Sequence, residues 1–289
     1  MTASSVVNMD GIAPALVTPF DRDGHLDTER LESLVGWIED LGVDFIVPCG
    51  STGEAPLLTA EERRTVIEVV VGAGEVPVLA GTGHPGRRAT VGATADAAEA
   101  GADAALVVTP FYYNHDQSTI EAYYRSVADA SDIPLHLYSV PPFTDSLIEP
   151  ETTGRLATHR NVLGMKDSSG DLTVAMRTLD ATADAAFDLM IGNAAVLRPA
   201  VADGASGGIL AIANVAPALA SRAAAGDADA HRTLVELNDR ILARHGIPGV
   251  KYAMRRLGAP AGHPRSPHRP LGDAARDAVD AALAGAGLR

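Results

Sequence analysis

The sequence predicts an α/β protein, a (β/α)8 barrel with a small helical extension at the C-terminus. Short apolar runs recur eight times in the first three quarters of the 289 residues, and segments with helical spacing separate them. The runs are nearly continuously apolar, which is typical of strands covered on both faces of a parallel sheet. Eight repeats of strand and helix favour a closed barrel over a doubly wound sheet, which usually needs fewer strands.

The expected strands are residues 12–17, 45–47, 76–79, 104–108, 134–137, 162–165, 187–191 and 208–212. The expected barrel helices are residues 27–41, 59–72, 87–100, 120–130, 150–158, 173–181 and 196–202. Several of these helices begin at a capping residue such as Thr59, and several end at a glycine, as at Gly42, Gly101 and Gly204.

Beyond Pro217 the strand-like runs stop, and residues 218–225, 228–245, 248–257 and 273–284 have helical spacing. Neither a low-complexity linker nor a long charge run divides the chain. We therefore expect a catalytic barrel domain of residues 1–222 and a C-terminal helical extension of residues 223–289.

The composition, 46% hydrophobic and 21% charged, is typical of globular proteins. A net charge of -14 argues against nucleic acid or an anionic membrane as partner, and also suits a protein that works at high salt. The start of the chain, Met1–Asp10, has no signal-peptide pattern, and the most apolar stretch, Gly207–Ala220, is too short to span a bilayer. A cytoplasmic location is expected. A single cysteine, Cys49, and scattered histidines predict no disulfide, no metal site and no cofactor.

Lys166 is one of two lysines and stands at the end of the apolar run that begins at Val162. Elsewhere the chain uses arginine for positive charge, and arginine cannot act as an amine nucleophile. Desolvation at a strand end favours the free amine of a lysine, which can form a Schiff base with a ketone or aldehyde. The alternative is an ordinary surface ion pair with Asp167 or another acid.

Polar motifs follow several of the expected strands. The carboxyl ends of barrel strands share one rim, so we expect these motifs to converge on Lys166. They are Pro48–Glu54, Thr109–Tyr113, Tyr138–Pro142 and Gly192–Asn193.

Three motifs suggest chemistry, each with a plainer alternative. Gly50, Ser51 and Thr52 offer backbone amides and hydroxyls suited to a substrate carboxylate, although this could be a tight turn. The Tyr138 phenol could move a proton beside a Schiff base, or could pack at the rim with a solvated hydroxyl. Tyr112 and Tyr113 could relay protons, stack or contact another subunit.

The glycine spacing of Gly81–Gly86 matches the pattern of a dinucleotide-binding loop, but this signal is weak, and Pro85 interrupts the run of backbone amides that such a loop needs.

Together the segments 14–20, 50–54, 137–141 and 164–167 resemble the dihydrodipicolinate synthase and N-acetylneuraminate lyase superfamily, class I pyruvate aldolases, over essentially the whole chain. The resemblance implies that Lys166 forms the Schiff base and Tyr138 is the general acid/base. It implies carboxylate and proton-relay hydroxyls on Ser51 and Thr52, and a tyrosine lent across a subunit interface at Tyr112. It also implies a pocket floor at Gly192 and Ile209, and a homotetramer built as a dimer of dimers.

One departure bears on the substrate. Dipicolinate synthases of this superfamily carry an arginine where this chain has Phe143, and an apolar ring cannot bind the carboxylate of aspartate semialdehyde. Segments 50–59, 137–141, 164–171 and 246–251 instead resemble 4-hydroxy-2-oxoglutarate aldolases. The resemblance thus implies a lyase that reversibly cleaves a 4-hydroxy-2-oxo acid to pyruvate and an aldehyde, with Ser168 and Asn193 as candidates for binding the distal end.

Other functions stay open. They are a 4-hydroxy-tetrahydrodipicolinate (dihydrodipicolinate) synthase in which Arg87, Arg88 or another group replaces the missing arginine, a 2-keto-3-deoxygluconate-type aldolase, a dehydratase, and a non-catalytic 2-oxo acid sensor. The second lysine, Lys251, is expected at the start of a helix in the extension, in a packing role or an ion pair.

Overall fold

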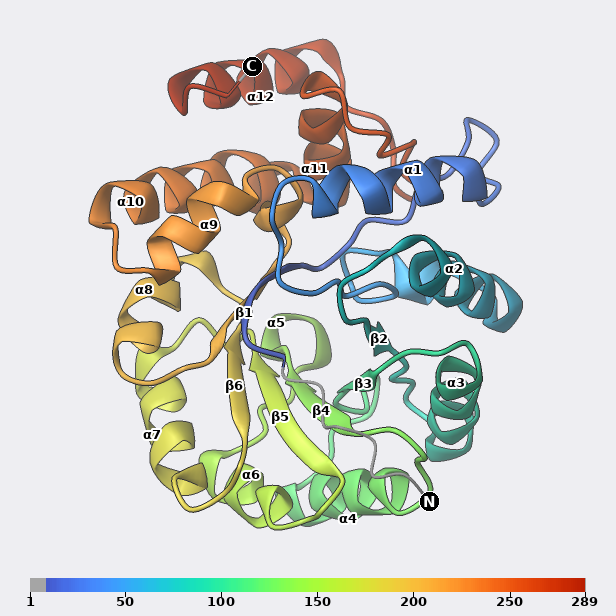
Figure 1. Ribbon diagram of the computed structural model, residues 1–289, viewed down its shortest axis with the longest axis vertical. Helices are drawn as coiled ribbons and strands as arrows, with labels where there is room; N and C mark the ends of the chain where they lie inside the picture. Colours follow the sequence, from blue (N-terminus) through green and yellow to red (C-terminus); the bar gives the residue numbers. More distant parts are fainter. Residues whose placement is uncertain (1–8, 289) are drawn as a thin grey trace.

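The computed structural model describes residues 9–288. Most of segment 1–10, in which the sequence shows no signal-peptide pattern, lies outside that range. Seven parallel strands form one curled sheet surrounded by helices (Figure 1). The strands are β1 Gly11–Pro14, β2 Leu79–Gly81, β3 Ala104–Val108, β4 Leu135–Ser139, β5 Val162–Asp167, β6 Asp188–Ile191 and β7 Gly207–Leu210. Their order in the sheet is β1-β7-β6-β5-β4-β3-β2.

Helices follow the strands along the chain and lie outside the sheet (Figure 1). Among the described residues, none of them is long and apolar enough to cross a membrane. Those up to residue 224 are α1 Thr28–Glu39, α2 Ala60–Ala73, α3 Arg87–Glu99, α4 Gln117–Ala128, α5 Pro141–Thr144, α6 Pro150–Ala157, α7 Leu172–Thr182, α8 Ala194–Ala202 and α9 Pro217–Ala224. The 3-10 turns are η1 Ala55–Leu57 and η2 Ile212–Asn214.

The expected strand at residues 45–47 forms only isolated bridges, so the prediction of a regular strand there is wrong. Val47 bridges Ala15, and Ile46 bridges Val78, both in the parallel sense. The amide of Leu16 donates to the Val47 carbonyl at 2.9 Å, and that of Leu79 to the Ile46 carbonyl at 3.0 Å. The segment is cut short by Pro48, which has no N–H to extend a ladder, and by the positive φ of Cys49.

Alternate residues of each strand face opposite sides of the sheet, as the pleat requires. The inner side holds one buried cluster that includes Ala13, Leu106, Tyr138, Met190 and Ile209. The neighbours of these residues along the strands, such as Ile12, Leu137 and Leu189, pack outward in the larger cluster. On β5, Met165 belongs to the outer cluster. The next residue, Lys166, therefore points inward.

Several helix boundaries follow the expected local chemistry. Thr59 and Glu62 form a capping box at the start of α2, with reciprocal hydrogen bonds of 3.1 and 3.0 Å. Gly42, Gly101 and Gly204 follow α1, α3 and α8 with φ of 77°, 92° and 116°, a backbone region that glycine enters without a side-chain clash.

The C-terminal helices are α10 Ala228–Leu237, the π-helical turn η3 Asn238–Ala243, α11 Arg244–Arg256 and α12 Asp273–Gly285. In Figure 1 the helix α10 lies beside α9, α11 lies next to α1, and α12 lies above them. The single helix expected over residues 228–245 thus contains a π-helical turn. In α11 the backbone is non-helical at Gly246, with φ of 58° and ψ of -153°. Short α5 was not expected, because four residues are too few to show helical spacing.

Candidate active site

Lys166 and Tyr138 lie side by side on neighbouring strands inside the curled sheet. They are register partners in the β4–β5 pair, and each is 5% exposed. The Lys166 Nζ lies 4.4 Å from the centre of the Tyr138 ring. The alternative of a surface ion pair is wrong for Lys166, because the strand alternation turns its side chain away from solvent. A buried amine beside a phenol is suited to carbonyl capture and proton transfer.

Gly192, directly after β6, and Ser168, directly after β5, lie beside the lysine side chain. A Cβ added at Gly192 would stand 3.0 Å from Lys166 Cε and 1.9 Å from Ser168 Oγ. The Gly192 amide donates to the Asp167 carbonyl at 2.6 Å, which holds this close approach. The structure therefore brings together Lys166, Tyr138, Gly192 and Ser168.

Asn193 has mainly a structural contact. Its Oδ1 accepts a hydrogen bond of 2.9 Å from the Ala195 amide and caps α8. Its amide nitrogen stands 2.7 Å from a Cβ that would be built on Gly170, so the side chain lies along the loop after β5. Ile209, on β7, is buried in the same inner cluster as Tyr138.

The Gly50–Glu54 loop follows the bridged segment 45–47 at the carboxyl end of the sheet. Thr52 is nearly buried and Ser51 is partly exposed. Among residues 9–288, no hydrogen bond joins either hydroxyl to Lys166 or Tyr138. Gly53 packs closely, since a Cβ there would lie 2.9 Å from the Leu16 carbonyl oxygen. The loop is anchored to the chain after β1 by a 2.7 Å hydrogen bond from Thr18 Oγ1 to the Gly53 carbonyl.

Three aromatic side chains near this end of the sheet face solvent. Tyr112 is 86% exposed, Tyr113 67% and Phe143 73%. The two tyrosine rings meet edge to face with centres 5.0 Å apart. Tyr112 has φ of 82°, a strained value for a tyrosine that costs about 1–3 kcal/mol unless its surroundings favour it. Neither tyrosine contacts Lys166 in the single chain, so the structure does not bring Tyr112 into the site.

The model of the dihydrodipicolinate synthetase family matches residues 8–286. The chain belongs to this family. It is a lyase of the aldolase type, as the sequence predicts.

Relatives in the family match along nearly their whole length. A 4-hydroxy-tetrahydrodipicolinate synthase of Methanothrix thermoacetophila is 38% identical over 272 residues, 91% of this chain and 92% of that relative. An uncharacterized DapA-like lyase of Halobacterium salinarum is 38% identical over 292 residues, 98% and 95% of the two chains. The dihydrodipicolinate synthase of Acinetobacter baumannii, solved with pyruvate, superimposes with a TM-score of 0.92 at 32% identity, over 98% of this chain and 100% of that one.

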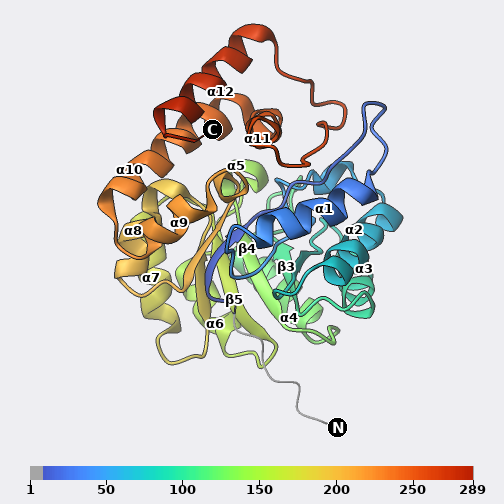
Figure 2. The ribbon, with the colours of Figure 1, turned by 45° about the horizontal axis from the view of Figure 1, so that its top comes forward.

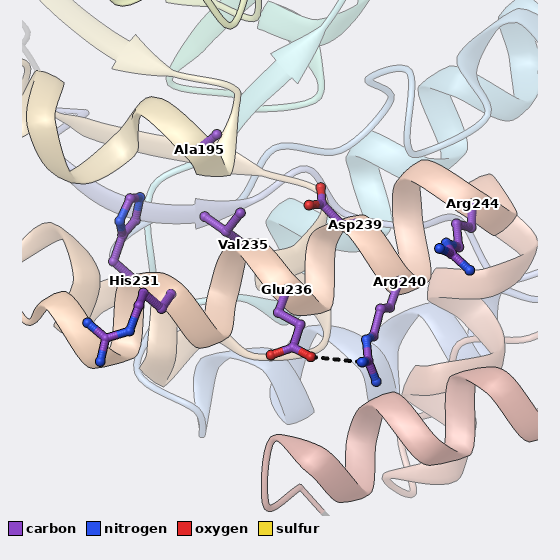
Figure 3. Close-up of a pocket in the computed structure, with 8 residues that line it drawn as sticks. Ala195, His231, Val235, Glu236, Asp239, Arg240 and Arg244 are labelled. Atoms are coloured by element: carbon purple, nitrogen blue, oxygen red, sulfur yellow. Dashed lines mark ion pairs between the residues drawn. The ribbon is translucent and has the colours of Figure 1, made fainter.

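A groove of about 560 Å³ lies outside the lysine site (Figure 3). It runs from Ala195, at the start of α8, along α10 and η3 to Arg244. Glu236 and Arg240 form an ion pair of 3.1 Å on its wall. Neither Lys166 nor Tyr138 lines it, so the groove is separate from the residues that the family would use.

Potential metal ligands gather at one place among residues 9–288. Asp21, Asp23 and His25 have ligand atoms within 4.8 Å of one another in the exposed turn after β1. The Asp21 carboxylate already accepts the Asp23 and His25 amides at 2.8 Å each. The cluster is an ordinary turn and carries no argument for a metal.

Sequence reasoning assigned no role to Glu54. Its side chain is fully buried and forms an ion pair with Lys251, whose side chain is also fully buried. The Lys251 Nζ lies 2.5 Å from the Glu54 Oε1. The expected ion pair of Lys251 is thus confirmed, although its partner lies 197 residues away. The one sequence signal that could have drawn attention to Lys251 is the rarity of lysine in this chain.

Proposed function

We propose that this family member condenses pyruvate with an aldehyde through a Schiff base on Lys166, and that the reaction is reversible. The main support for this proposal is that the Lys166 amine is buried and lies 4.4 Å from the centre of the Tyr138 ring on the adjacent strand. The side chain of Lys166 shares the inside of the sheet with the buried cluster that includes Tyr138, Met190 and Ile209. Ser51 and Thr52 are proposed to bind the pyruvate carboxylate through hydroxyls and loop amides.

The chemistry then follows from the groups present. The free amine attacks the keto carbon of pyruvate, water leaves, and a protonated imine remains on Lys166. Loss of a proton from the pyruvate methyl gives an enamine, whose terminal carbon attacks the aldehyde. Tyr138 carries protons to and from these positions, and hydrolysis of the imine then frees the product and the lysine.

Among aldehydes, the names of the relatives favour 4-hydroxy-tetrahydrodipicolinate synthase, the alternative raised from the sequence, over 4-hydroxy-2-oxoglutarate aldolase. We therefore propose aspartate semialdehyde as the aldehyde partner. Arg87 does not suit the role of the missing arginine, because it is engaged with Ser126 of α4 at 2.8 Å. A backbone amide or another cation would have to hold the distal carboxylate.

The second candidate stays 4-hydroxy-2-oxoglutarate aldolase, and Phe143 is the observation that favours it. The two are separated by steady-state rates with aspartate semialdehyde, 4-hydroxy-2-oxoglutarate and 2-keto-3-deoxygluconate. Borohydride reduction in the presence of pyruvate should leave an adduct on Lys166, located by peptide mass. An adduct on Lys251, or full turnover by Lys166→Ala, would refute the mechanism. A dehydratase would release water in place of an aldehyde, and a sensor would bind pyruvate without turnover.

We also propose that the protein is a homotetramer, a dimer of dimers, in which Tyr112 completes the site of a neighbouring subunit. The exposure of Tyr112, Tyr113 and Phe143 supports this, because large apolar side chains exposed together mark contact surfaces. The hydrogen bond of 3.1 Å between Thr109 and Thr144 joins the two loops that carry them. Sedimentation of Tyr112→Ala should reveal smaller species than the wild-type protein.

Three further expectations remain proposals. Segment 45–47 would act as the eighth strand and close the barrel, supported by its bridges to Ala15, just after β1, and to Val78, just before β2. The chain would divide into a barrel domain, 1–222, and an extension, 223–289, although residue 222 lies within α9. A cytoplasmic location without nucleic-acid or membrane partners fits the net charge of -14.

A further inference from the structure

The Gly50–Glu54 loop has an unusual backbone at both ends. Cys49 and Glu54 each have φ of 57°, in the left-handed region that side chains other than glycine rarely enter. The Glu54 amide donates to the Ser51 carbonyl at 3.1 Å, which folds the loop on itself. Such a conformation persists only where the surroundings hold it.

The Glu54 carboxylate is held from the C-terminal part of the chain. Lys251 Nζ, on α11, donates to Oε1 at 2.5 Å. The backbone amide of Arg265 donates to Oε2 at 2.9 Å. Both carboxylate oxygens are therefore tied to residues beyond the sheet.

Lys251 uses all three of its N–H donors. Besides Glu54, it donates to the Thr18 carbonyl at 2.5 Å and to the His263 carbonyl at 2.8 Å. Its ammonium also stands 4.6 Å from the centre of the Phe20 ring. Because Phe20 pairs with His263, the loop after β1 and the coil between α11 and α12 run side by side here (Figure 2).

Thr18 connects this network to the loop a second time. Its carbonyl accepts from Lys251, and its hydroxyl donates to the Gly53 carbonyl at 2.7 Å. The ammonium of Lys251 thus holds Glu54 directly and the neighbouring Gly53 through Thr18. Burial lowers the pKa of Lys251 to about 8, with the Glu54 carboxylate acting in the opposite sense, so the amine is mostly protonated at pH 7.

We propose that Lys251 is a positioning residue for pyruvate: through Glu54 and Thr18 it fixes the Ser51–Gly53 backbone and hydroxyls in the orientation that receives the substrate carboxylate. The C-terminal extension then takes part in substrate binding without touching the substrate. This inference rests on the proposed function, in which the loop binds pyruvate and Lys166 captures it.

The test compares Lys251→Met with the double variant Lys251→Met and Glu54→Gln. The single variant leaves a buried carboxylate without its counter-charge and could unfold, whereas the double variant buries no charge at this point. Glu54→Gln alone keeps the side-chain volume and one oxygen that can face Lys251, and Lys251 keeps its hydrogen bond to the Thr18 carbonyl, but the buried ammonium loses its counter-charge. Arg256→Met serves as the matched control, since it removes an exposed ion pair with Asp280 from the same helix.

The readout is the pyruvate concentration that gives half-maximal borohydride trapping on Lys166, measured below the melting temperature of every variant. We expect it to rise about tenfold or more in Lys251→Met and in the double variant, with the maximal trapped fraction and the KM for the aldehyde unchanged. Glu54→Gln should show a smaller rise, and Arg256→Met none.

A folded Lys251→Met or double variant with wild-type half-saturation would overturn the proposal. If the Lys251–Glu54 pair had only a structural role, these variants would have a lower melting temperature but the wild-type half-saturation for pyruvate. If wild-type Lys166 were not trapped at all, the proposed function would fail instead, so the two failures are distinguishable.

Discussion

Lys166 and Tyr138 face one another as direct partners in the parallel β4–β5 ladder, with the amine 4.4 Å from the ring centre. Their separation is therefore set by the spacing between hydrogen-bonded strands, which is about 4.8 Å, rather than by the conformation of a loop. A site built on strands keeps its geometry more rigidly than one built on loops.

Tyr138→Phe should separate the two proposed chemical roles. The ring that covers Lys166 stays, while the hydroxyl that moves protons is lost. We expect kcat to fall by roughly 10²–10⁴ while borohydride still traps pyruvate on Lys166. Wild-type kcat in this variant would show that the phenol hydroxyl has no part in the reaction.

Gly192→Ala should impair capture without unfolding the protein. The added methyl would press on Lys166 Cε at 3.0 Å and on Ser168 Oγ. We expect the rate of pyruvate trapping to fall about tenfold or more, corresponding to overpacking of about 1–3 kcal/mol. The control is Gly36→Ala in α1, where a Cβ meets nothing within 4 Å. Equal trapping rates in the two variants would contradict the close packing around the lysine.

Phe143→Arg tests the choice of aldehyde. Phe143 stands where the resemblance implies the carboxylate-binding arginine of dipicolinate synthases, and its side chain is largely exposed, so a guanidinium fits there. We expect kcat/KM for aspartate semialdehyde to rise by roughly tenfold relative to an uncharged aldehyde, because an arginine pairs with a carboxylate through two hydrogen bonds. Phe143→Leu should leave that ratio unchanged. A ratio unaffected by the arginine would mean that the distal carboxylate binds elsewhere.

His136 should make stability depend on pH. It is buried on β4, its Nδ1 lacks a hydrogen-bond partner, and burial lowers its pKa from 6.5 to about 4. Between those values the unfolded chain binds more protons than the folded one. Stability should therefore fall as pH drops from 6.5 to 4, by about 3 kcal/mol for this residue.

Urea denaturation at several pH values measures this loss. His136→Gln, which cannot be protonated, should show a shallower decline over the same window. A slope identical to that of the wild-type protein would indicate that other groups account for the acid sensitivity.

The sequence predicted the positions of seven strands and the inward-facing Lys166, because apolar runs ending in polar residues are local patterns. It did not predict that residues 45–47 form only bridges, since that depends on where Pro48 and Cys49 turn the chain. The link between Lys251 and Glu54 joins residues that no local pattern relates. The exposure of Tyr112 is likewise visible only in three dimensions, where nothing in a single chain covers its ring.

Both lysines of this chain are buried, one beside Tyr138 and the other against Glu54. Apart from the terminal amino group, the protein offers no ready primary amine to acylating reagents or to sugars and aldehydes in solution. Aldehydes and ketones that form imines with surface lysines of other proteins find no such lysine here. A surface without lysine therefore confines imine formation to the buried amine that a substrate can reach.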